Sequence, residues 1–463
     1  MDDLTSYSAA KLAEMIKARA VSPVEVVQSH LDRIGLINPA LNAVVTIGSD
    51  VLDQARLAEA SVMKGDELGS LHGVPITVKD TIETAGLRTT FGSKLFADFV
   101  PKKDAAVVSR LKNAGAIILG KTNTPEMAIP YETDNAVFGR TNNPLDVSRT
   151  AGGSSGGEAA AIAAHLSPAG IGSDLSGSIR VPAHFCGIAG LKPATGRVPM
   201  SGHVPRAAGL LAQGACIGPM ARHVEDLKLL FGVIADGGSD PTAPDERDLR
   251  GVSVAWYADD GIVPVTEETS RAVRTAAAAL RDRGTQISEC VPPGVTEGAQ
   301  LWIELFSASS LDELRETYRG QEYLAGATVQ SLLSAPVISS TESAIRLQAA
   351  QAALARRDKL RDALLQWMGP GQIIIAPVGS RTAFAHGSRR VDIDGRSISV
   401  FRAFSYCQTY NVFDLPVVTI PVARGRNGLP IGVQIIGPPR EEAHVLRVAG
   451  IIEQDLRAGL PDE

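Results

Sequence analysis

From about residue 70 onward, the chain alternates between apolar segments of strand length and segments with the pattern of helices. The strand-like segments lie at residues 74–78, 116–119, 252–257, 285–290, 372–376, 417–420 and 431–436. Regular alternation of these two patterns is typical of sheets whose helices pack on both faces. The sequence therefore predicts an α/β fold.

The first 65 residues are predicted to be mostly helical, with one short strand at residues 43–47. Their clearest signal is Ser22-Pro23-Val24-Glu25, in which a serine, a proline and a glutamate are spaced as in a capping box. Such a box begins a helix. Farther along, the polar and glycine-rich segment 237–245 is expected to be a surface connection.

Charge and composition narrow the classes of partner. The 463 residues include 45 Lys and Arg against 51 Asp and Glu, which gives a net charge of −6. A mildly acidic chain without a basic block is not expected to bind nucleic acid through bulk charge. The start of the chain lacks the pattern of a signal peptide, and no apolar run has the length of a membrane span. We therefore expect a cytoplasmic protein that acts on a neutral small molecule.

Cysteines and histidines form no recognisable metal or catalytic pattern. The four cysteines are far apart, at Cys186, Cys216, Cys290 and Cys407. Several histidines are scattered in the same way, at His72, His165, His184 and His203. No cluster has the spacing of metal ligands, and no histidine is placed beside a candidate nucleophile. The sequence predicts neither a metal nor a cofactor.

Two glycine- and serine-rich loops, at residues 152–157 and 172–178, each precede a helical segment. The first is not a phosphate-binding loop, because no Lys-Ser/Thr pair follows its last glycine. It also matches G-x-S-x-G, but a nucleophile elbow follows directly on a strand, and we do not expect residues 142–151 to form one. In the second loop, free main-chain N–H groups could face a developing oxyanion. Taken alone, the first loop is more typical of a structural turn, and the second is as typical of a turn as of a site.

Lys79 ends the apolar strand predicted at residues 74–78. A lysine in this position commonly marks the point where a strand reaches solvent. If the side chain is buried instead, desolvation of its ammonium group lowers its pKa enough for it to act as a base. The strand alone leaves both interpretations open.

The stretch from Gly152 to Ala183 resembles the signature of the amidase signature family. It reads GGSSGGEAAAIAAH, a spacer, and GSDLSGSIRVPA, with Ser154 and Ser178 at the spacing that the signature requires. Other segments similar to family landmarks are GVPITVKD at 73–80, KTNTPEMA at 121–128, GPMAR at 218–222 and GLPIGVQIIGP at 428–438. The likeness covers most of the chain and is strongest at residues 70–235.

The resemblance implies the family's fold, a central mixed sheet of many strands with helices on both faces, and a role for each matching residue. The implied catalytic residues are Lys79 as the base, Ser154 as the bridging serine after a cis peptide bond, and Ser178 as the nucleophile. The implied oxyanion hole consists of the main-chain N–H groups of Leu175, Ser176, Gly177 and Ser178. The implied supporting residues are Gly153, Ser155, Asp174 and Arg180.

Two parts of the chain depart from the family's commonest pattern. Leu175 and Ser176 stand where threonine and glycine are usual, and Asp414 stands where glycine is common. Main-chain donors survive such replacements, so we expect these departures to change the shape of the substrate site rather than the chemistry.

We expect a single domain over residues 1–463, because the strands near the chain's end would complete the sheet. Its expected parts are an N-terminal helical region (1–65), a signature core (66–236), a divergent region that shapes the substrate pocket (237–410) and C-terminal strands and helix (411–463). Candidates for the pocket wall are Met127, Tyr131, Trp302, Phe306, Phe401, Phe404 and Tyr406.

The family resemblance implies a hydrolase that cleaves C–N bonds of small carboxamides through an acyl-enzyme. The expected substrates are primary amides, anilides or carbamates; the signature does not choose among them, and urethanase activity is one of these alternatives. We expect the chain to act as a monomer or homodimer, without nucleic acid or membrane. Two alternatives are the A subunit of a glutamyl-tRNA(Gln)-type amidotransferase and a catalytically inactive amide-binding protein.

Overall fold

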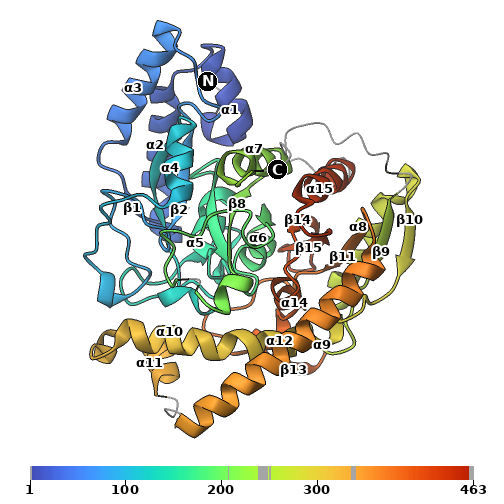
Figure 1. Ribbon diagram of the computed structural model, residues 1–463. Coiled ribbons are helices and arrows are strands. Elements are labelled where there is room, and N and C mark those ends of the chain that lie inside the picture. Colours follow the sequence, from blue (N-terminus) through green and yellow to red (C-terminus); the bar gives the residue numbers. More distant parts are fainter. Residues whose placement is uncertain (1–2, 207, 238–248, 250–251, 335–339, 458–463) are drawn as a thin grey trace.

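The computed structural model describes residues 3–206, 208–237, 249, 252–334 and 340–457 (Figure 1). The strands are β1 (Val44–Ile47), β2 (Pro75–Lys79), β3 (Ile117–Thr122), β4 (Asn142–Asn143), β5 (Asp146–Thr150), β6 (Ala169–Asp174), β7 (Ala189–Lys192), β8 (Cys216–Ala221), β9 (Ser253–Trp256), β10 (Gln286–Glu289), β11 (Ile373–Pro377), β12 (Arg390–Ile393), β13 (Arg396–Ser399), β14 (Val417–Arg424) and β15 (Pro430–Ile436).

In the described residues, one 11-stranded sheet has the order β1-β3-β2-β6-β8-β7-β14-β15-β11-β9-β10. Strands β3, β2 and β6 run parallel to one another, as do β11, β9 and β10. The remaining neighbours are antiparallel. The prediction of a mixed sheet of many strands is confirmed. Because strands from both halves of the chain share this sheet, we propose that residues 1–463 form one domain.

The helices are α1 (Ala9–Lys17), α2 (Pro23–Leu41), α3 (Val51–Lys64), α4 (Ala106–Asn113), α5 (Gly156–Ala163), α6 (Arg180–Cys186), α7 (Val224–Ile234), α8 (Glu267–Ala279), α9 (Val295–Trp302), α10 (Ala308–Tyr318), α11 (Ala327–Leu333), α12 (Ser340–Met368), α13 (Val400–Ala403), α14 (Tyr406–Val412) and α15 (Glu442–Arg457). The capping box predicted at Ser22 begins α2. Ser22 Oγ accepts from the Glu25 N–H, and the Glu25 carboxylate accepts from the Ser22 N–H.

Alternate residues of the central strands face opposite layers of helices. On β2, Ile76 and Val78 belong to an apolar core that also includes side chains of α1, α4, α7, α8 and α15. Thr77 points to the other face, where it contacts Glu158 of α5, and where α2, α3, α5 and α6 form a second core. Helices therefore cover both faces of the sheet, as predicted. Lys79 has the same parity as Thr77, so it also points toward α5.

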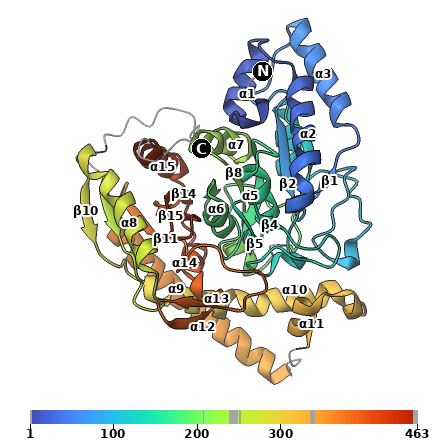
Figure 2. The same ribbon diagram turned by 180° about the vertical axis from the view of Figure 1, so that it is seen from behind.

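Helices α9, α10 and α12 lie along the bottom of the molecule in both Figure 1 and Figure 2. The side chains of α9, α12 and α14 form a third core with residues of β11 and β15. The divergent region is therefore packed against the last strands of the sheet.

Two local predictions are wrong. Strand β5, Asp146–Thr150, pairs with β4 just before the first glycine- and serine-rich loop, where we expected no strand. Strand β5 belongs to a two-stranded hairpin outside the main sheet. Its sequence, DVSRT, is mostly polar, so it lacks the apolar residues by which a strand is recognised. The second predicted loop, 172–178, begins inside β6, which ends at Asp174. The predicted connection 237–245 lies outside the described residues beyond Gly237.

None of the helices in the described ranges is both long enough and apolar enough to cross a membrane.

Candidate active site

Two neighbouring parallel strands end at the same edge of the sheet and bring Lys79 beside Ser173. Strand β2 ends at Lys79 and pairs with β6, which contains Ser173 and ends at Asp174. The Nζ of Lys79 lies 3.0 Å from Ser173 Oγ. Ser173 is not among the predicted site residues, because its segment was predicted to be a loop. Assigning it to a strand next to β2 would have placed its side chain near Lys79.

The second neighbour of Lys79 is Ser154, whose Oγ lies 2.6 Å from Lys79 Nζ. The Gly153–Ser154 peptide bond is cis, as the resemblance implied. Gly153 lies so close to the main chain of Pro130 that a Cβ at this position would be 2.5 Å from the Pro130 carbonyl oxygen. On the other side, Thr124 Oγ1 donates to the carbonyl of Ser154 at 3.0 Å. Close packing and this hydrogen bond fix the direction of the Ser154 side chain.

Ser155 connects the two glycine- and serine-rich segments. Its N–H donates to the carbonyl of Ser178 at 3.0 Å, and its Oγ accepts from the N–H of Ser173 at 3.3 Å. These bonds hold Ser178 near Ser154, and both residues line the same cavity. In the described structure, no hydrogen bond joins Ser154 Oγ to Ser178 Oγ.

Burial determines the protonation of Lys79. The side chain is fully buried, and desolvation of its ammonium group lowers its pKa to about 7, although Asp174 and Glu158 act in the opposite direction. The interpretation of Lys79 as a solvent-exposed strand end is therefore wrong. Near neutral pH, a large fraction of this lysine is an uncharged amine that can accept a proton.

Glu158 is a buried acid that the sequence analysis did not single out. It lies in the first turn of α5, where its carboxylate accepts from Thr77 Oγ1 and, at 2.7 Å, from Thr122 Oγ1. Burial raises its pKa to about 7, against the effects of these hydrogen bonds and of the nearby lysines. A single acidic residue in an otherwise apolar helix start, GGEAAAIA, was the available signal.

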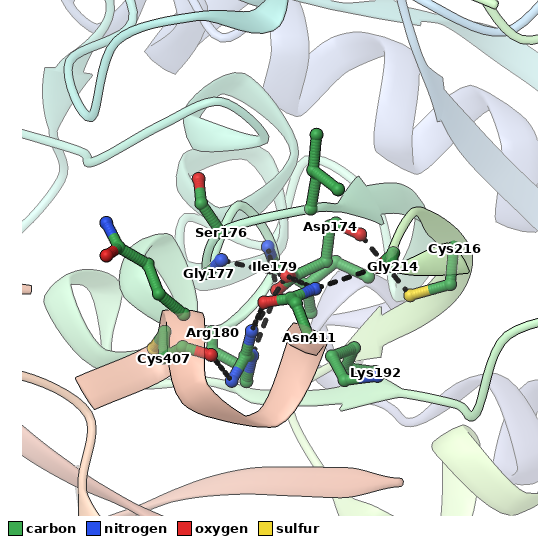
Figure 3. Close-up of polar contacts among 12 residues, drawn as sticks. Asp174, Ser176, Gly177, Ile179, Arg180, Lys192, Gly214, Cys216, Cys407 and Asn411 are labelled. Carbon is green, nitrogen blue, oxygen red and sulfur yellow. Dashed lines mark hydrogen bonds and ion pairs between the residues drawn. The ribbon is translucent and has the colours of Figure 1, made fainter. Parts of the chain in front are cut away.

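The loop after β6 is held by a buried ion pair between Asp174 and Arg180, drawn in Figure 3. The guanidinium donates to Asp174 at 2.8 and 3.0 Å, and neither side chain is accessible to solvent. It also donates to the Cys407 carbonyl, Asn411 Oδ1 and Gln434 Oε1 at 2.6–2.9 Å. Burial alone would raise the pKa of Asp174, but Arg180 holds it well below its ordinary value.

One of the four expected oxyanion donors already has an acceptor. The N–H of Gly177 donates to Asp174 Oδ1 at 2.8 Å, so it is not free in this structure (Figure 3). For the N–H groups of Leu175, Ser176 and Ser178, no acceptor is found within the described chain. In this structure the carboxylate of Asp174 therefore satisfies the N–H of Gly177, one of the four expected donors.

A cavity of about 670 Å³ lies beside Ser154, Ser173 and Ser178. Four of the aromatic and apolar residues predicted for its wall do line it: Met127, Tyr131, Trp302 and Phe401. Phe401 is 39% exposed and stacks on Tyr131 with a centroid separation of 6.2 Å. The wall therefore combines residues of the signature core with residues of the divergent region.

Three predicted wall residues lie behind the cavity instead. Phe306 packs edge to face against Trp302, at a centroid distance of 5.9 Å, and Phe404 packs in the same way against Phe185, at 5.1 Å. The Tyr406 hydroxyl donates to the carbonyl of Val263. All three side chains are buried in apolar clusters, which leaves them no contact with the cavity.

Several further residues line the cavity that the sequence did not identify. Apolar examples are Leu311, Leu314, Leu332 and Phe384, polar or charged examples are Glu132, Arg206, Glu313 and Arg389, and His203 and Cys216 also contribute. Most come from segments far apart in sequence, so their convergence depends on the tertiary fold. In the parts of the chain that the structure describes, no three His, Cys, Asp or Glu residues are grouped as metal ligands.

Comparison with known proteins finds matches over nearly the whole chain. The amidase family model matches residues 25–446. The chain is 32% identical to the A subunit of the glutamyl-tRNA(Gln) amidotransferase of Carboxydothermus hydrogenoformans, and the alignment covers 98% of both chains. It is 33% identical to an acylamidase of Rhodococcus erythropolis, over 96% of this chain and 94% of the relative. The solved structure of a 6-aminohexanoate cyclic dimer hydrolase with its substrate superposes with a TM-score of 0.85 at 27% identity, covering 98% of each chain.

Replacing Arg180 with methionine should strongly destabilise the protein. The change leaves the Asp174 carboxylate buried without its counter-ion, a situation that costs about 3–5 kcal/mol. Urea unfolding followed by tryptophan fluorescence measures this loss. Arg56→Met is the matched control, because Arg56 and its partner Asp53 are largely exposed and their pair contributes little. Equal effects of the two substitutions would contradict the structural role given to the buried pair.

Proposed function

Because this chain belongs to the amidase signature family, we propose that it hydrolyses C–N bonds of small carboxamides through an acyl-enzyme on Ser178. The observation that carries the proposal is the contact between a buried lysine, Lys79, and Ser154, in a cavity that Ser178 also lines. A serine hydroxyl becomes a good nucleophile only when a base removes its proton. The lowered pKa of Lys79 makes it that base.

In the proposed reaction, the Ser178 hydroxyl turns about its side-chain bond toward Ser154 and attacks the substrate carbonyl. Its proton passes to Ser154 Oγ as the Ser154 proton passes to the neutral amine of Lys79. The same path then returns a proton to the leaving nitrogen, and the C–N bond breaks. Water attacks the resulting ester by the reverse route, which releases the acid and restores Ser178.

We propose that the tetrahedral oxyanion is held by the N–H groups of Leu175, Ser176 and Ser178. Donors that are already oriented in a site with little water stabilise such a charge strongly. Gly177 contributes indirectly, since its hydrogen bond to Asp174 fixes the turn of the loop.

The proposed substrates are primary amides, anilides or carbamates with an apolar group. Support comes from the cavity wall, in which Met127, Trp302, Leu311 and Phe401 provide apolar surface. Carbamates fit the same chemistry, because attack on the carbamate carbonyl with loss of its amine leaves an alkoxycarbonyl-enzyme, which water hydrolyses as it does an acyl-enzyme. We propose that the chain acts on these small molecules as a monomer or homodimer, in the cytoplasm.

A second candidate function is that of an amidotransferase A subunit, which the similarity to such subunits favours. Charged cavity residues such as Arg206 and Glu313 could bind the charged ends of glutamine. The purified chain should be assayed alone with acetamide, acyl anilides, a fatty amide, aryl carbamates and glutamine. Turnover of an anilide or carbamate at least about tenfold faster than of glutamine is expected. Preference for glutamine, or activity only with added partner subunits, would favour the second candidate.

Ser178→Ala should abolish turnover and labelling by a fluorophosphonate, while the folded structure persists, because only one oxygen atom is removed. Mass spectrometry of the labelled wild-type protein should locate the adduct on Ser178. Ser155→Ala is the comparison, since Ser155 also lies in the cluster but supports the loop through its hydrogen bonds. Retained activity in Ser178→Ala with loss in Ser155→Ala would show that Ser178 is not the nucleophile. A wild-type chain that binds amides without any turnover would instead be an inactive binding protein.

Activity should rise with pH through about 7 and level off above it. Below this value Lys79 is an ammonium ion that cannot accept a proton, and above it the amine is neutral. Glu158→Gln should move this limb slightly to lower pH, because Glu158, which is itself partly ionised near pH 7, then no longer favours the ammonium. Lys79→Ala should remove the limb and slow an amide about 10²–10⁴-fold more than a p-nitrophenyl ester of the same acid, whose leaving group needs no proton. Profiles of kcat/KM against pH provide the test, and an unchanged limb in Lys79→Ala would contradict the relay.

A further inference from the structure

Trp302 lines the cavity, but its indole also makes a polar contact that the proposed chemistry does not use. The indole N–H donates to the carbonyl of Leu175 at 2.8 Å. One residue farther along, the Tyr131 hydroxyl donates to the carbonyl of Ser176 at 2.6 Å. Two aromatic side chains of the wall therefore hold successive carbonyls of the loop that leads to Ser178.

Because a peptide unit is planar, a hydrogen bond that holds its carbonyl group also fixes the direction of its N–H group. The peptide unit between Leu175 and Ser176 is trans, so its C=O and N–H point in opposite directions. The contact with Trp302 thereby directs the Ser176 N–H away from α9. The described chain offers this N–H no acceptor, whereas the next one, at Gly177, donates to Asp174.

The position of the indole is itself fixed by packing. Trp302 is the last residue of α9 and is followed by a π-helical turn, Ile303–Ser307, a feature that often occurs beside functional sites. At Gly298, α9 approaches α14 so closely that a Cβ would collide with Thr409. Helix α14 also supplies two acceptors to Arg180, the Cys407 carbonyl and Asn411. The helix that carries the indole and the buried ion pair are therefore both in contact with α14.

We propose that Trp302 is a positioning residue for the oxyanion hole, which it serves by orienting the Ser176 N–H toward the oxyanion that forms on attack by Ser178. This inference rests on the proposed hydrolase function and deepens it. The same ring that contacts the substrate also sets a main-chain donor. A substrate group that packs on Trp302 therefore affects the rate of the chemical step as well as the binding affinity.

The test is Trp302→Phe, which keeps an aromatic ring and removes the N–H. Loss of an oxyanion donor costs about 10²–10³-fold in kcat, and misorientation costs part of that. We expect kcat to fall about 10–100-fold while KM changes less than about threefold. A trifluoromethyl ketone with the same acyl group forms an oxyanion adduct with the serine, so its inhibition constant should rise by the factor that kcat/KM loses.

Two variants separate positioning from packing. Leu446→Ala removes apolar packing from α15 in the first core, which does not include Trp302, so it should lower the melting temperature and leave kcat within about twofold. Tyr131→Phe removes the hydrogen bond to the Ser176 carbonyl, which belongs to the same peptide unit as the Gly177 N–H. That N–H is also held by Asp174. Tyr131→Phe should therefore reduce kcat, but by less than Trp302→Phe does. If Trp302→Phe folds poorly, Tyr131→Phe still tests whether the wall residues position the loop.

Unchanged kcat and ketone inhibition in both Trp302→Phe and Tyr131→Phe would overturn the inference, as would an equal loss of kcat in Leu446→Ala. If Ser178 is labelled and required for turnover while these variants behave like the wild type, only the role of Trp302 is wrong. If Ser178→Ala keeps wild-type turnover, the proposed function is wrong and the inference falls with it.

Discussion

The buried ion pair between Asp174 and Arg180 is the interaction on which the geometry of the site depends. Asp174 ends a central strand, and its carboxylate turns back to accept from the N–H groups of Gly177 and Ile179. Arg180 begins the helix after the loop and connects it to α14 and β15. Such a pair is costly to bury unless every donor is satisfied. Here the guanidinium has five acceptor contacts, so the loop is held from both ends.

Parallel strands explain why a lysine can be buried beside serines without a carboxylate in direct contact. The ends of β2 and β6 meet at one edge, and α5 covers them. Lys79 is left with two hydroxyl neighbours, Ser154 and Ser173, and with Asp174 and Glu158 acting only at longer range. A close ion pair would keep the ammonium charged. Hydroxyl partners allow desolvation to dominate, which is the condition for a base at neutral pH.

Features that depend on local motifs could be predicted from the sequence, whereas features that depend on the convergence of distant segments could not. The alternation of strands and helices predicted the fold, and the spacing of Ser154 and Ser178 led to the family. Ser173 was missed because glycine, serine and aspartate disfavour strands in isolation, while pairing with β2 and β8 overrides that preference. Phe306 and Phe404 are as apolar as Trp302 and Phe401. Which of them faces a cavity is decided by tertiary packing, which their spacing does not reveal.

Leu175, which departs from the family's common pattern, lies against the divergent region of the chain. Leu175 replaces the common threonine, and its side chain packs on the apolar cluster that contains Trp302. Its carbonyl accepts from the indole of Trp302, which is a member of that cluster. Ser176 is bound through its carbonyl, by Tyr131. Because hydrogen bonds to carbonyls do not depend on side-chain identity, the loop can change its side chains toward a new substrate while its N–H groups keep their directions.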